Sequence, residues 1–193
     1  MSSTIIERPT EPNVSEPRHQ QQGDAVNPDQ FRAAFRRHPG GVALVTALGP
    51  SGPAALTATS VTSISAEPAV LAFSVSHASS AAAAIVAAAT VVVHLLDVSN
   101  VHLAKLGATS GIDRFADRTL WSELPTGEPV FHGTRWLRAR VFDRVSAGSA
   151  TLILAEPVES NVTDDPADTG SVREGLVYLD RTWHRLGDGS RLD

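Results

Sequence analysis

Cysteine is absent from the 193 residues of the sequence. This absence excludes disulfide bonds, a thiol nucleophile, and any metal or iron–sulfur centre held by thiolates. Because no protein group of this kind is available, redox chemistry in this chain requires a bound cofactor.

A long apolar run is also missing. No segment approaches the roughly 20 apolar residues that a membrane-spanning helix needs, and the N-terminus lacks the basic and apolar regions of a signal peptide. The formal net charge of −5 argues against a general nucleic-acid surface, although it leaves a local basic patch open. We therefore expect a cytoplasmic protein that binds neither membranes nor nucleic acids.

The chain has the length and apolar content of one domain, since 42 % of its residues are hydrophobic. Residues 1–26 contain no aromatic residue and are rich in Glu, Pro, Ser and Gln, which predicts a disordered tail. We expect the domain over residues 27–187, a C-terminal tail over residues 188–193, and a mobile polar loop over residues 163–171.

Periodicity and turn residues predict many short strands and few helices. Asn27 and Pro28 mark a helix start, and Phe31 and Phe35 share one face of that helix. Strands are expected at residues 42–46, 56–64, 70–75, 91–96, 136–142, 151–155, 176–179 and 182–186, and further helices at residues 81–89 and from Ser99 or Asn100 to 106. The pattern predicts a mainly β fold, a closed antiparallel barrel with a few short helices.

Two patches rich in hydroxyl groups flank the apolar strands. Their members are Thr57, Thr59, Ser60, Thr62, Ser63 and Ser65 in the first patch, and Ser74, Ser76, Ser79 and Ser80 around His77 in the second. Each hydroxyl donates one hydrogen bond and accepts two, so the patches suit a heterocycle or a phosphate, whereas the alternative is an exposed strand and a helix cap. Ser79 or Ser80 is expected to cap the helix, whose unpaired N–H groups favour an anion.

Seven histidines are present, but they predict no metal site. His77, His94, His102, His132 and His184 fall on separate predicted elements, without the short spacing of zinc or iron ligands. His94 lies within an apolar run and is interpreted as a buried histidine with its hydrogen bonds satisfied.

Seven short segments occur in an order typical of one family. They are residues 35–42 ending in Pro-Gly-Gly-Val, 56–60 (Leu-Thr-Ala-Thr-Ser), 63–65 (Ser-Ile-Ser) with Pro68, Ser79-Ser80, 95–97 (Leu-Leu-Asp), 114–116 (Arg-Phe-Ala) and 176–178 (Leu-Val-Tyr). In these segments the chain resembles, over about residues 31–186, the flavin reductase family with the FMN-binding split-barrel fold. Members of this family serve two-component flavin monooxygenases.

The resemblance implies a homodimer that binds FMN or FAD and transfers a hydride from NADH or NADPH to the flavin for a separate monooxygenase. The implied cofactor contacts are Thr57, Ala58, Thr59 and Ser60 to the flavin, Ser63, Ile64 and Ser65 to its ring or ribityl chain, Ser79 and Ser80 beside His77 to the phosphate, and Arg114 with Phe115 near that phosphate. No protein side chain is implied as a catalytic nucleophile, acid or base.

The sequence departs from the family pattern at the nicotinamide side. Where many members have Gly-Asp-His-Thr, residues 148–151 are Gly-Ser-Ala-Thr, so that Ala150 replaces a histidine associated with the nicotinamide. His77 replaces a common Arg or Asn, and Ala81 replaces a common Thr. An alternative function therefore stays open: a barrel that holds FMN or haem as a carrier or sensor without accepting a hydride.

Overall fold

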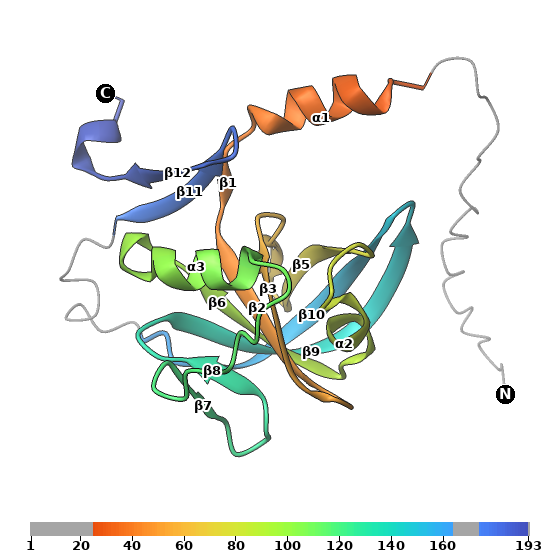
Figure 1. Cartoon of the computed structure of the whole chain (residues 1–193), viewed down its shortest axis with the longest axis vertical. Helices are drawn as coiled ribbons and strands as arrows, with labels where there is room; N and C mark the ends of the chain where they lie inside the picture. The colour runs from red at the N-terminus through yellow and green to blue at the C-terminus, as the bar shows by residue number, and fades with distance from the viewer. Residues whose placement is uncertain (1–24, 164–173, 193) are drawn as a thin grey trace, which may run out of the picture.

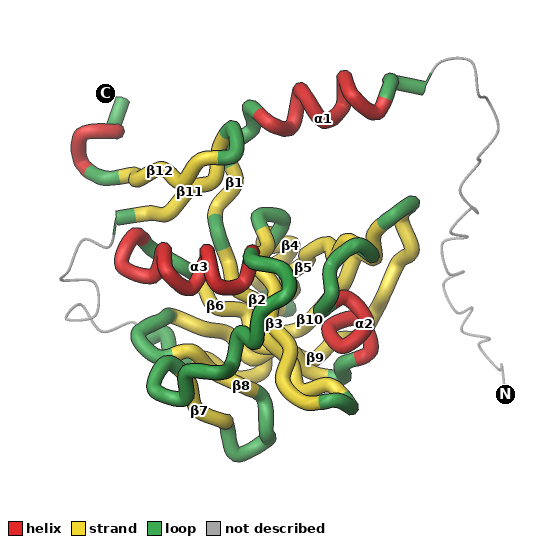
Figure 2. Tube along the Cα trace, in the orientation of Figure 1, coloured by secondary structure: helices red, strands yellow, loops and turns green. Residues whose placement is uncertain are grey.

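A computed structural model of the chain describes residues 25–163 and 174–192 (Figure 1). The predicted tail over residues 1–26 and the predicted loop over residues 163–171 fall almost entirely outside this part. Strands predominate, and the helices α1 (Pro28–Arg36), α2 (Ala82–Ala87) and α3 (Val101–Ala108) lie around them (Figure 2). No helix among the described residues is long and apolar enough to cross a membrane.

A seven-stranded antiparallel sheet forms the body of the fold, in the order β3-β2-β6-β9-β10-β5-β4. Its strands are β2 (Ala43–Gly49), β3 (Gly52–Ala58), β4 (Thr62–Ala66), β5 (Ala69–Ser76), β6 (Thr90–Leu95), β9 (Arg135–Ala147) and β10 (Ala150–Ser160). The sheet curls so that the chain after β3 meets β5, where the Ser60 hydroxyl accepts from the Ser74 N–H at 3.0 Å and donates to its carbonyl at 3.3 Å. This architecture confirms the predicted mainly β split barrel.

Two local predictions were wrong. Residues 56–64 do not form one strand, because β3 ends at Ala58 and pairs with β2, whereas β4 begins at Thr62 and pairs with β5. The predicted helix over residues 81–89 is the shorter α2 (Ala82–Ala87). The remaining predicted strands match β2, β5, β6, β9, β10, β11 (Gly175–Leu179) and β12 (Thr182–Leu186), except that Val42 lies one residue before β2 and Leu96 one residue after β6.

The barrel encloses one apolar core, and a second core lies on its outer surface. Val45, Phe73 and Ile153 point into the barrel, where Ile85 of α2 packs against them. The outer core joins β2 to α3 (Val101–Ala108), to the β7 (Trp121–Glu123) and β8 (Pro129–Phe131) hairpin, and to β11. A Cβ on Gly107 would collide with Leu44 and Thr57, so glycine is what allows α3 to approach β3 so closely.

Two buried polar side chains have their hydrogen bonds satisfied. His94 Nδ1 donates to the Leu44 carbonyl at 2.9 Å, and the Phe131 N–H donates to His94 Nε2 at 3.1 Å. Burial lowers the pKa of His94 from 6.5 to about 4, although the bond to Leu44 opposes this shift. The prediction of a satisfied core histidine is confirmed.

The second buried polar side chain with satisfied hydrogen bonds is that of Glu128, which is 4 % exposed. Its carboxylate accepts from Arg138 Nε at 2.9 Å and from the hydroxyls of Thr90 and Thr126. Burial raises the pKa of Glu128, but these hydrogen bonds outweigh burial and lower it below its usual value.

A small sheet and α1 (Pro28–Arg36) extend from the barrel (Figure 1). The sheet has the order β1-β11-β12, with β1 (Gly40–Gly41), β11 (Gly175–Leu179) and β12 (Thr182–Leu186). Asn27 accepts from the Asp29 N–H at 2.8 Å, which confirms the predicted helix start. The Asp180 N–H donates to the Arg36 carbonyl at 2.9 Å and ties the end of α1 to the hairpin turn.

Candidate functional site

The ends of β3 and β5 form a small cavity with the start of β10. Its volume is about 260 Å³, and we call it the hydroxyl cavity. Its lining residues are Leu56, Thr57, Ala58, Thr59, Ser60, Ser74, Val75, Ser76, Ser79 and Ala150. The structure therefore brings the two predicted hydroxyl patches together, although they are about 15 to 20 residues apart in the chain.

The hydroxyl groups in this region do not all serve the same purpose. Thr57 Oγ1 donates to the Ala104 carbonyl at 2.7 Å and so fixes α3 on β3. The Ser60 hydroxyl accepts from the Ser74 N–H and donates to the Ser74 carbonyl. These two side chains thus hold the walls of the cavity, and their donor hydrogens already have protein acceptors.

Other hydroxyls keep their hydrogens for a ligand. Ser76 Oγ and Ser79 Oγ accept from backbone N–H groups two residues further on, and each O–H is left to donate. Among the described residues, the hydroxyls of Thr59 and Ser80 have no hydrogen-bond partner. Part of the polar lining of this region, the hydroxyls of Thr59, Ser76, Ser79 and Ser80, therefore consists of neutral donors whose hydrogens have no acceptor among the described residues.

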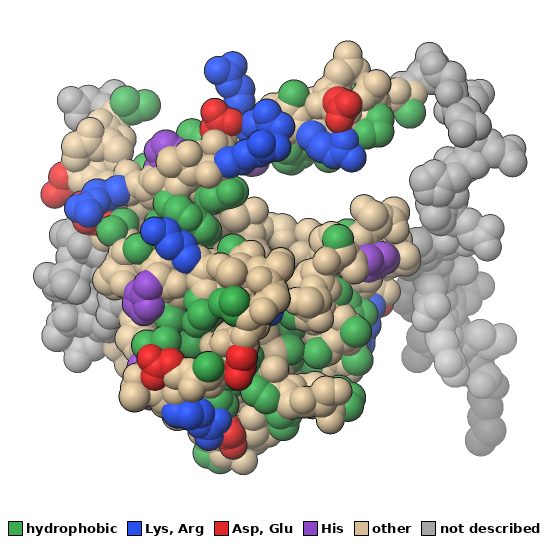
Figure 3. Space-filling model, in the orientation of Figure 1, with side chains coloured by type: hydrophobic (Ala, Val, Ile, Leu, Met, Phe, Trp, Pro, Cys, Tyr) green, Lys and Arg blue, Asp and Glu red, His purple; other side chains and the backbone are tan. Residues whose placement is uncertain are grey.

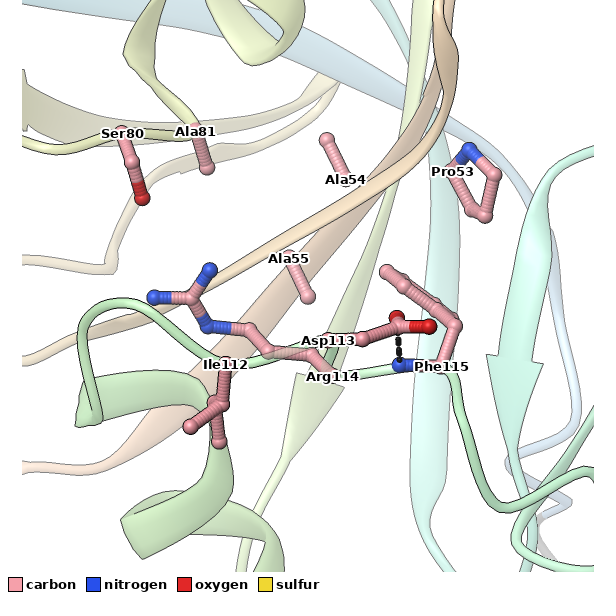
Figure 4. A pocket seen from close by; sticks show the side chains of 9 residues that line it. All are labelled: Pro53, Ala54, Ala55, Ser80, Ala81, Ile112, Asp113, Arg114 and Phe115. Atoms are coloured by element: carbon pink, nitrogen blue, oxygen red, sulfur yellow. Dashed lines mark hydrogen bonds between the residues drawn. The ribbon is translucent and has the colours of Figure 1, made fainter.

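A neighbouring cavity of about 160 Å³ brings Ser80 together with Arg114 and Phe115, and we call it the Arg114 cavity (Figure 4). Arg114 Nε donates to the Gly107 carbonyl at 3.2 Å, and Nη2 donates to the Thr109 carbonyl at 2.6 Å. These bonds to the end of α3 hold the guanidinium at the edge of the cavity. The two elements assigned to the flavin phosphate by resemblance, about 35 residues apart, therefore line one space.

The start of α2 differs from the expected cap. Ala81 occupies the N-cap position and makes no side-chain capping bond, so neither Ser79 nor Ser80 caps the helix. Ser79 Oγ instead accepts from the Ala81 N–H at 3.3 Å, and the Ser79 carbonyl accepts from the Ala82 N–H at 3.0 Å. A tight turn thus precedes the helix and points Ser80 toward the Arg114 cavity (Figure 4).

Four of the predicted contacts lie elsewhere. Ser63, Ile64 and Ser65 are on β4, at the edge of the sheet, and line neither the hydroxyl cavity nor the Arg114 cavity. His77 is exposed at the end of β5, and its Nε2 lies 3.0 Å from Thr151 Oγ1. Its imidazole therefore contacts Thr151, the residue that follows Ala150, where the family histidine is missing.

A third cavity was missed by sequence reasoning. It has a volume of about 740 Å³ and lies between α1, the β11–β12 turn and the barrel. It shares Thr59, Ser60 and Ser74 with the hydroxyl cavity. The sequence offered two separate signals for it: the pair Phe31 and Phe35 on one helix, and the resemblance of the hairpin with Tyr178 and Arg181 to a region that borders the active site in the family. These two walls are about 140 residues apart in the chain, and their meeting was not predicted.

Comparisons with known proteins agree with this geometry. The model of the flavin reductase like domain matches residues 35–187. An NADH:FMN oxidoreductase of Rhodococcus qingshengii is 40 % identical over 156 residues, which cover 80 % of this chain and 80 % of the relative.

Two solved structures share the fold. The flavin reductase domain protein of Arthrobacter sp. FB24 has a TM-score of 0.75 at 30 % identity, covering 86 % of this chain and 97 % of the other. The NADH:FAD oxidoreductase of Streptomyces globisporus C-1027, solved with NAD and FAD fragments, has a TM-score of 0.71 at 26 % identity, covering 87 % and 99 %. The chain belongs to the flavin reductase family.

The donor set fits a flavin mononucleotide. Uncommitted hydroxyls suit the mixed donor and acceptor edge of an isoalloxazine ring, and one fixed guanidinium beside Ser80 suits a phosphate. Among the described residues, no group of three or more His, Asp or Glu side chains is placed to hold a metal ion.

Proposed function

We propose that the protein reduces FMN with NADH, and that the phosphate of the flavin lies in the Arg114 cavity. The activity is that of an NAD(P)H:flavin oxidoreductase, as the family membership and the Rhodococcus relative support. The observation that carries the site assignment is the meeting of Ser80 and Arg114 on one cavity next to the hydroxyl cavity. In the balanced reaction, NADH, a proton and oxidised flavin give NAD⁺ and reduced flavin.

A bound flavin would supply the redox chemistry, as the acceptor of a hydride from the nicotinamide. The residues of this chain bind and orient the reactants. Thr59 and Ser79 donate to polar atoms of the ring system or the ribityl chain, and Arg114 and Ser80 offset the charge of the phosphate. Holding the two rings in line is what the protein contributes to the rate.

The proposal includes a homodimer in the cytoplasm and a separate flavin-dependent monooxygenase that receives the reduced flavin. Phe142 on β9 is 54 % exposed, and Val145 on the same strand is exposed as well. Apolar side chains on one protruding strand are typical of a surface that another subunit covers. Sedimentation velocity tests the dimer, and a monomer at micromolar protein contradicts it.

Anaerobic oxidation of NADH tests the enzyme function. Purified protein with equimolar FMN is mixed with NADH, and the nicotinamide and flavin absorbance bands are followed together. We expect one flavin bleached for each NADH oxidised. Because Ala150 stands in place of the family histidine, the alternative function is tested as well. A protein that retains flavin on dialysis, but whose flavin NADH does not bleach, is a flavin carrier.

A further inference from the structure

The segment that carries Arg114 has no regular secondary structure. Residues 109–120 join the end of α3 to the start of β7 without a helix or a strand, and we call them the Arg114 loop. In its middle part, residues 110–116, no backbone group bonds to the backbone of a described helix or strand. The position of this part of the loop is therefore set by side chains.

Side-chain hydrogen bonds connect the loop to the elements on both sides of it. On one side, the Arg114 guanidinium donates to the carbonyls of Gly107 and Thr109 at the end of α3. On the other side, the indole Nε1–H of Trp121 donates to the Phe115 carbonyl at 3.1 Å. Because Trp121 is the first residue of β7, this second bond ties the residue after Arg114 to a strand.

The ring of Phe115 is held by the same hairpin. It packs edge-on against Trp121, with ring centroids 5.0 Å apart, and against Phe131 with centroids 5.6 Å apart. Trp121 and Phe131 lie opposite each other on β7 and β8. All three side chains are buried in the outer core, where aromatic pairs of this geometry add to the stabilisation from burial. Phe115 is thus the point at which the loop is anchored to the barrel.

A charged side chain covers the indole of Trp121 toward the solvent. The guanidinium carbon of Arg118 lies 4.0 Å from the centre of the indole ring, and Arg118 pairs with Glu123 at 3.7 Å. Figure 3 shows charged side chains of both signs gathered over this part of the molecule, near the foot of the view. A cation over an aromatic face is an attractive contact, so the indole is held between Arg118 and the outer core.

We propose that Trp121 is a positioning residue that holds Arg114 in place for the phosphate of the flavin. This inference rests on the proposed function, in which that phosphate lies in the Arg114 cavity. Phe115 lines this cavity beside Arg114 (Figure 4), whereas Trp121 lines none of the three cavities described above. Trp121 therefore acts through the loop. A loop that is already held does not have to be ordered when the ligand binds, and this raises the affinity.

Arg114 keeps donors for a phosphate while it is anchored. A guanidinium has more N–H donors than the bonds to Gly107 and Thr109 use, and Nη1 donates to no described residue. A phosphate can therefore accept from Arg114 without displacing an anchor. Because riboflavin has no phosphate, the position of the loop matters more for FMN than for riboflavin.

The test compares FMN with riboflavin in equilibrium dialysis. Trp121→Phe keeps an aromatic ring in the outer core and removes the N–H donor. We expect the Kd for FMN to rise about three- to tenfold, the effect of one lost hydrogen bond, and the Kd for riboflavin to change less than about twofold. Trp136→Phe on β9 is the matched control and is expected to change neither Kd, because the Trp136 indole N–H has no hydrogen-bond partner among the described residues and lines none of these cavities.

A second variant separates the hydrogen bond from the packing. Replacement of Trp121 by benzothienylalanine keeps the shape of the indole and puts sulfur in place of the N–H, so the contacts with Phe115 and Phe131 are retained even if Trp121→Phe does not fold. We expect the same selective loss of FMN affinity. An equal rise of both Kd values, or an unchanged Kd for FMN, overturns the proposal.

A double-mutant cycle with Arg114→Ala shows whether Trp121 acts through Arg114. In the Arg114→Ala background, Trp121→Phe is expected to leave the ratio of the two Kd values unchanged, and an undiminished effect there contradicts the proposal. If Arg114→Ala itself does not change this ratio, the phosphate assignment fails and the role of Trp121 fails with it. If Arg114→Ala changes the ratio and neither variant at Trp121 does, only the role of Trp121 is wrong.

Discussion

The buried His94 makes the stability of the fold depend on pH in a defined window. Its pKa is lowered from 6.5 to about 4 in the folded state, because burial disfavours the imidazolium. Below pH 6.5 the unfolded chain binds a proton at this position, while the folded protein does not. Protonation therefore favours unfolding, and stability falls as the pH decreases from 6.5 until it reaches the folded pKa near 4.

The magnitude follows from the linkage relation. Each pH unit inside the window changes the free energy of unfolding by about 1.4 kcal/mol, so moving from pH 7 to pH 5 removes about 2 kcal/mol. The full shift corresponds to about 3 kcal/mol. For a domain whose total stability is about 5–15 kcal/mol, this is a large fraction.

Urea unfolding of the wild type and of His94→Gln at pH 7, 6 and 5 measures the effect. The glutamine side chain is expected to lower stability at pH 7, because it does not satisfy both Leu44 and Phe131. The difference between the two proteins is expected to shrink by about 2 kcal/mol between pH 7 and pH 5. A constant difference across this range would refute the assignment of the slope to His94.

Three further predictions concern packing, ion pairing and ligand binding. Gly107→Ala is expected to destabilise the fold by about 2 kcal/mol or more in urea unfolding, whereas Gly41→Ala, with free space around its Cβ, is the tolerated control. Glu128→Gln is expected to cost about 3 kcal/mol at pH 7 and progressively less below pH 4.5, where the unfolded carboxylate is protonated; a cost independent of pH contradicts this. Replacing Ser80 by alanine is expected to weaken FMN binding more than riboflavin binding in equilibrium dialysis, because Ser80 lines the Arg114 cavity that is assigned to the phosphate, and equal losses exclude this assignment.

Local sequence patterns were sufficient to predict the positions of most strands. They were insufficient where contacts between distant residues determine where a strand ends. The residues from Leu56 to Ile64 include no Gly, Pro, Asn or Asp, so no strong turn residue marks the break between β3 and β4. The break occurs because the Ser60 hydroxyl bonds both backbone groups of Ser74 and turns the chain from one edge of the sheet to the other. Local periodicity cannot predict a hydrogen bond between residues that are fourteen positions apart in the sequence.

The same limit explains the missed cavity. The amphipathic face of α1 was recognised from Phe31 and Phe35, but an isolated helix face gives no information about what lies opposite. The opposite wall depends on β1 pairing with β11 and on the Asp180 N–H reaching the Arg36 carbonyl. These contacts join segments about 140 residues apart, and only the folded chain shows that they enclose a space.

The two hydroxyl patches show why residue type alone overestimates the number of side chains that are available to bind a ligand. By composition, Thr57 and Ser60 are as good donors as Thr59 and Ser80. In the structure the first two give their hydrogens to backbone carbonyls, so their loss should loosen α3 or the junction of β3 with β5 before it affects any ligand contact. The hydroxyls of Thr59 and Ser80 make no hydrogen bond to another described residue. Substitutions at these two positions therefore report on ligand binding, and those at Thr57 and Ser60 report first on the walls of the cavity.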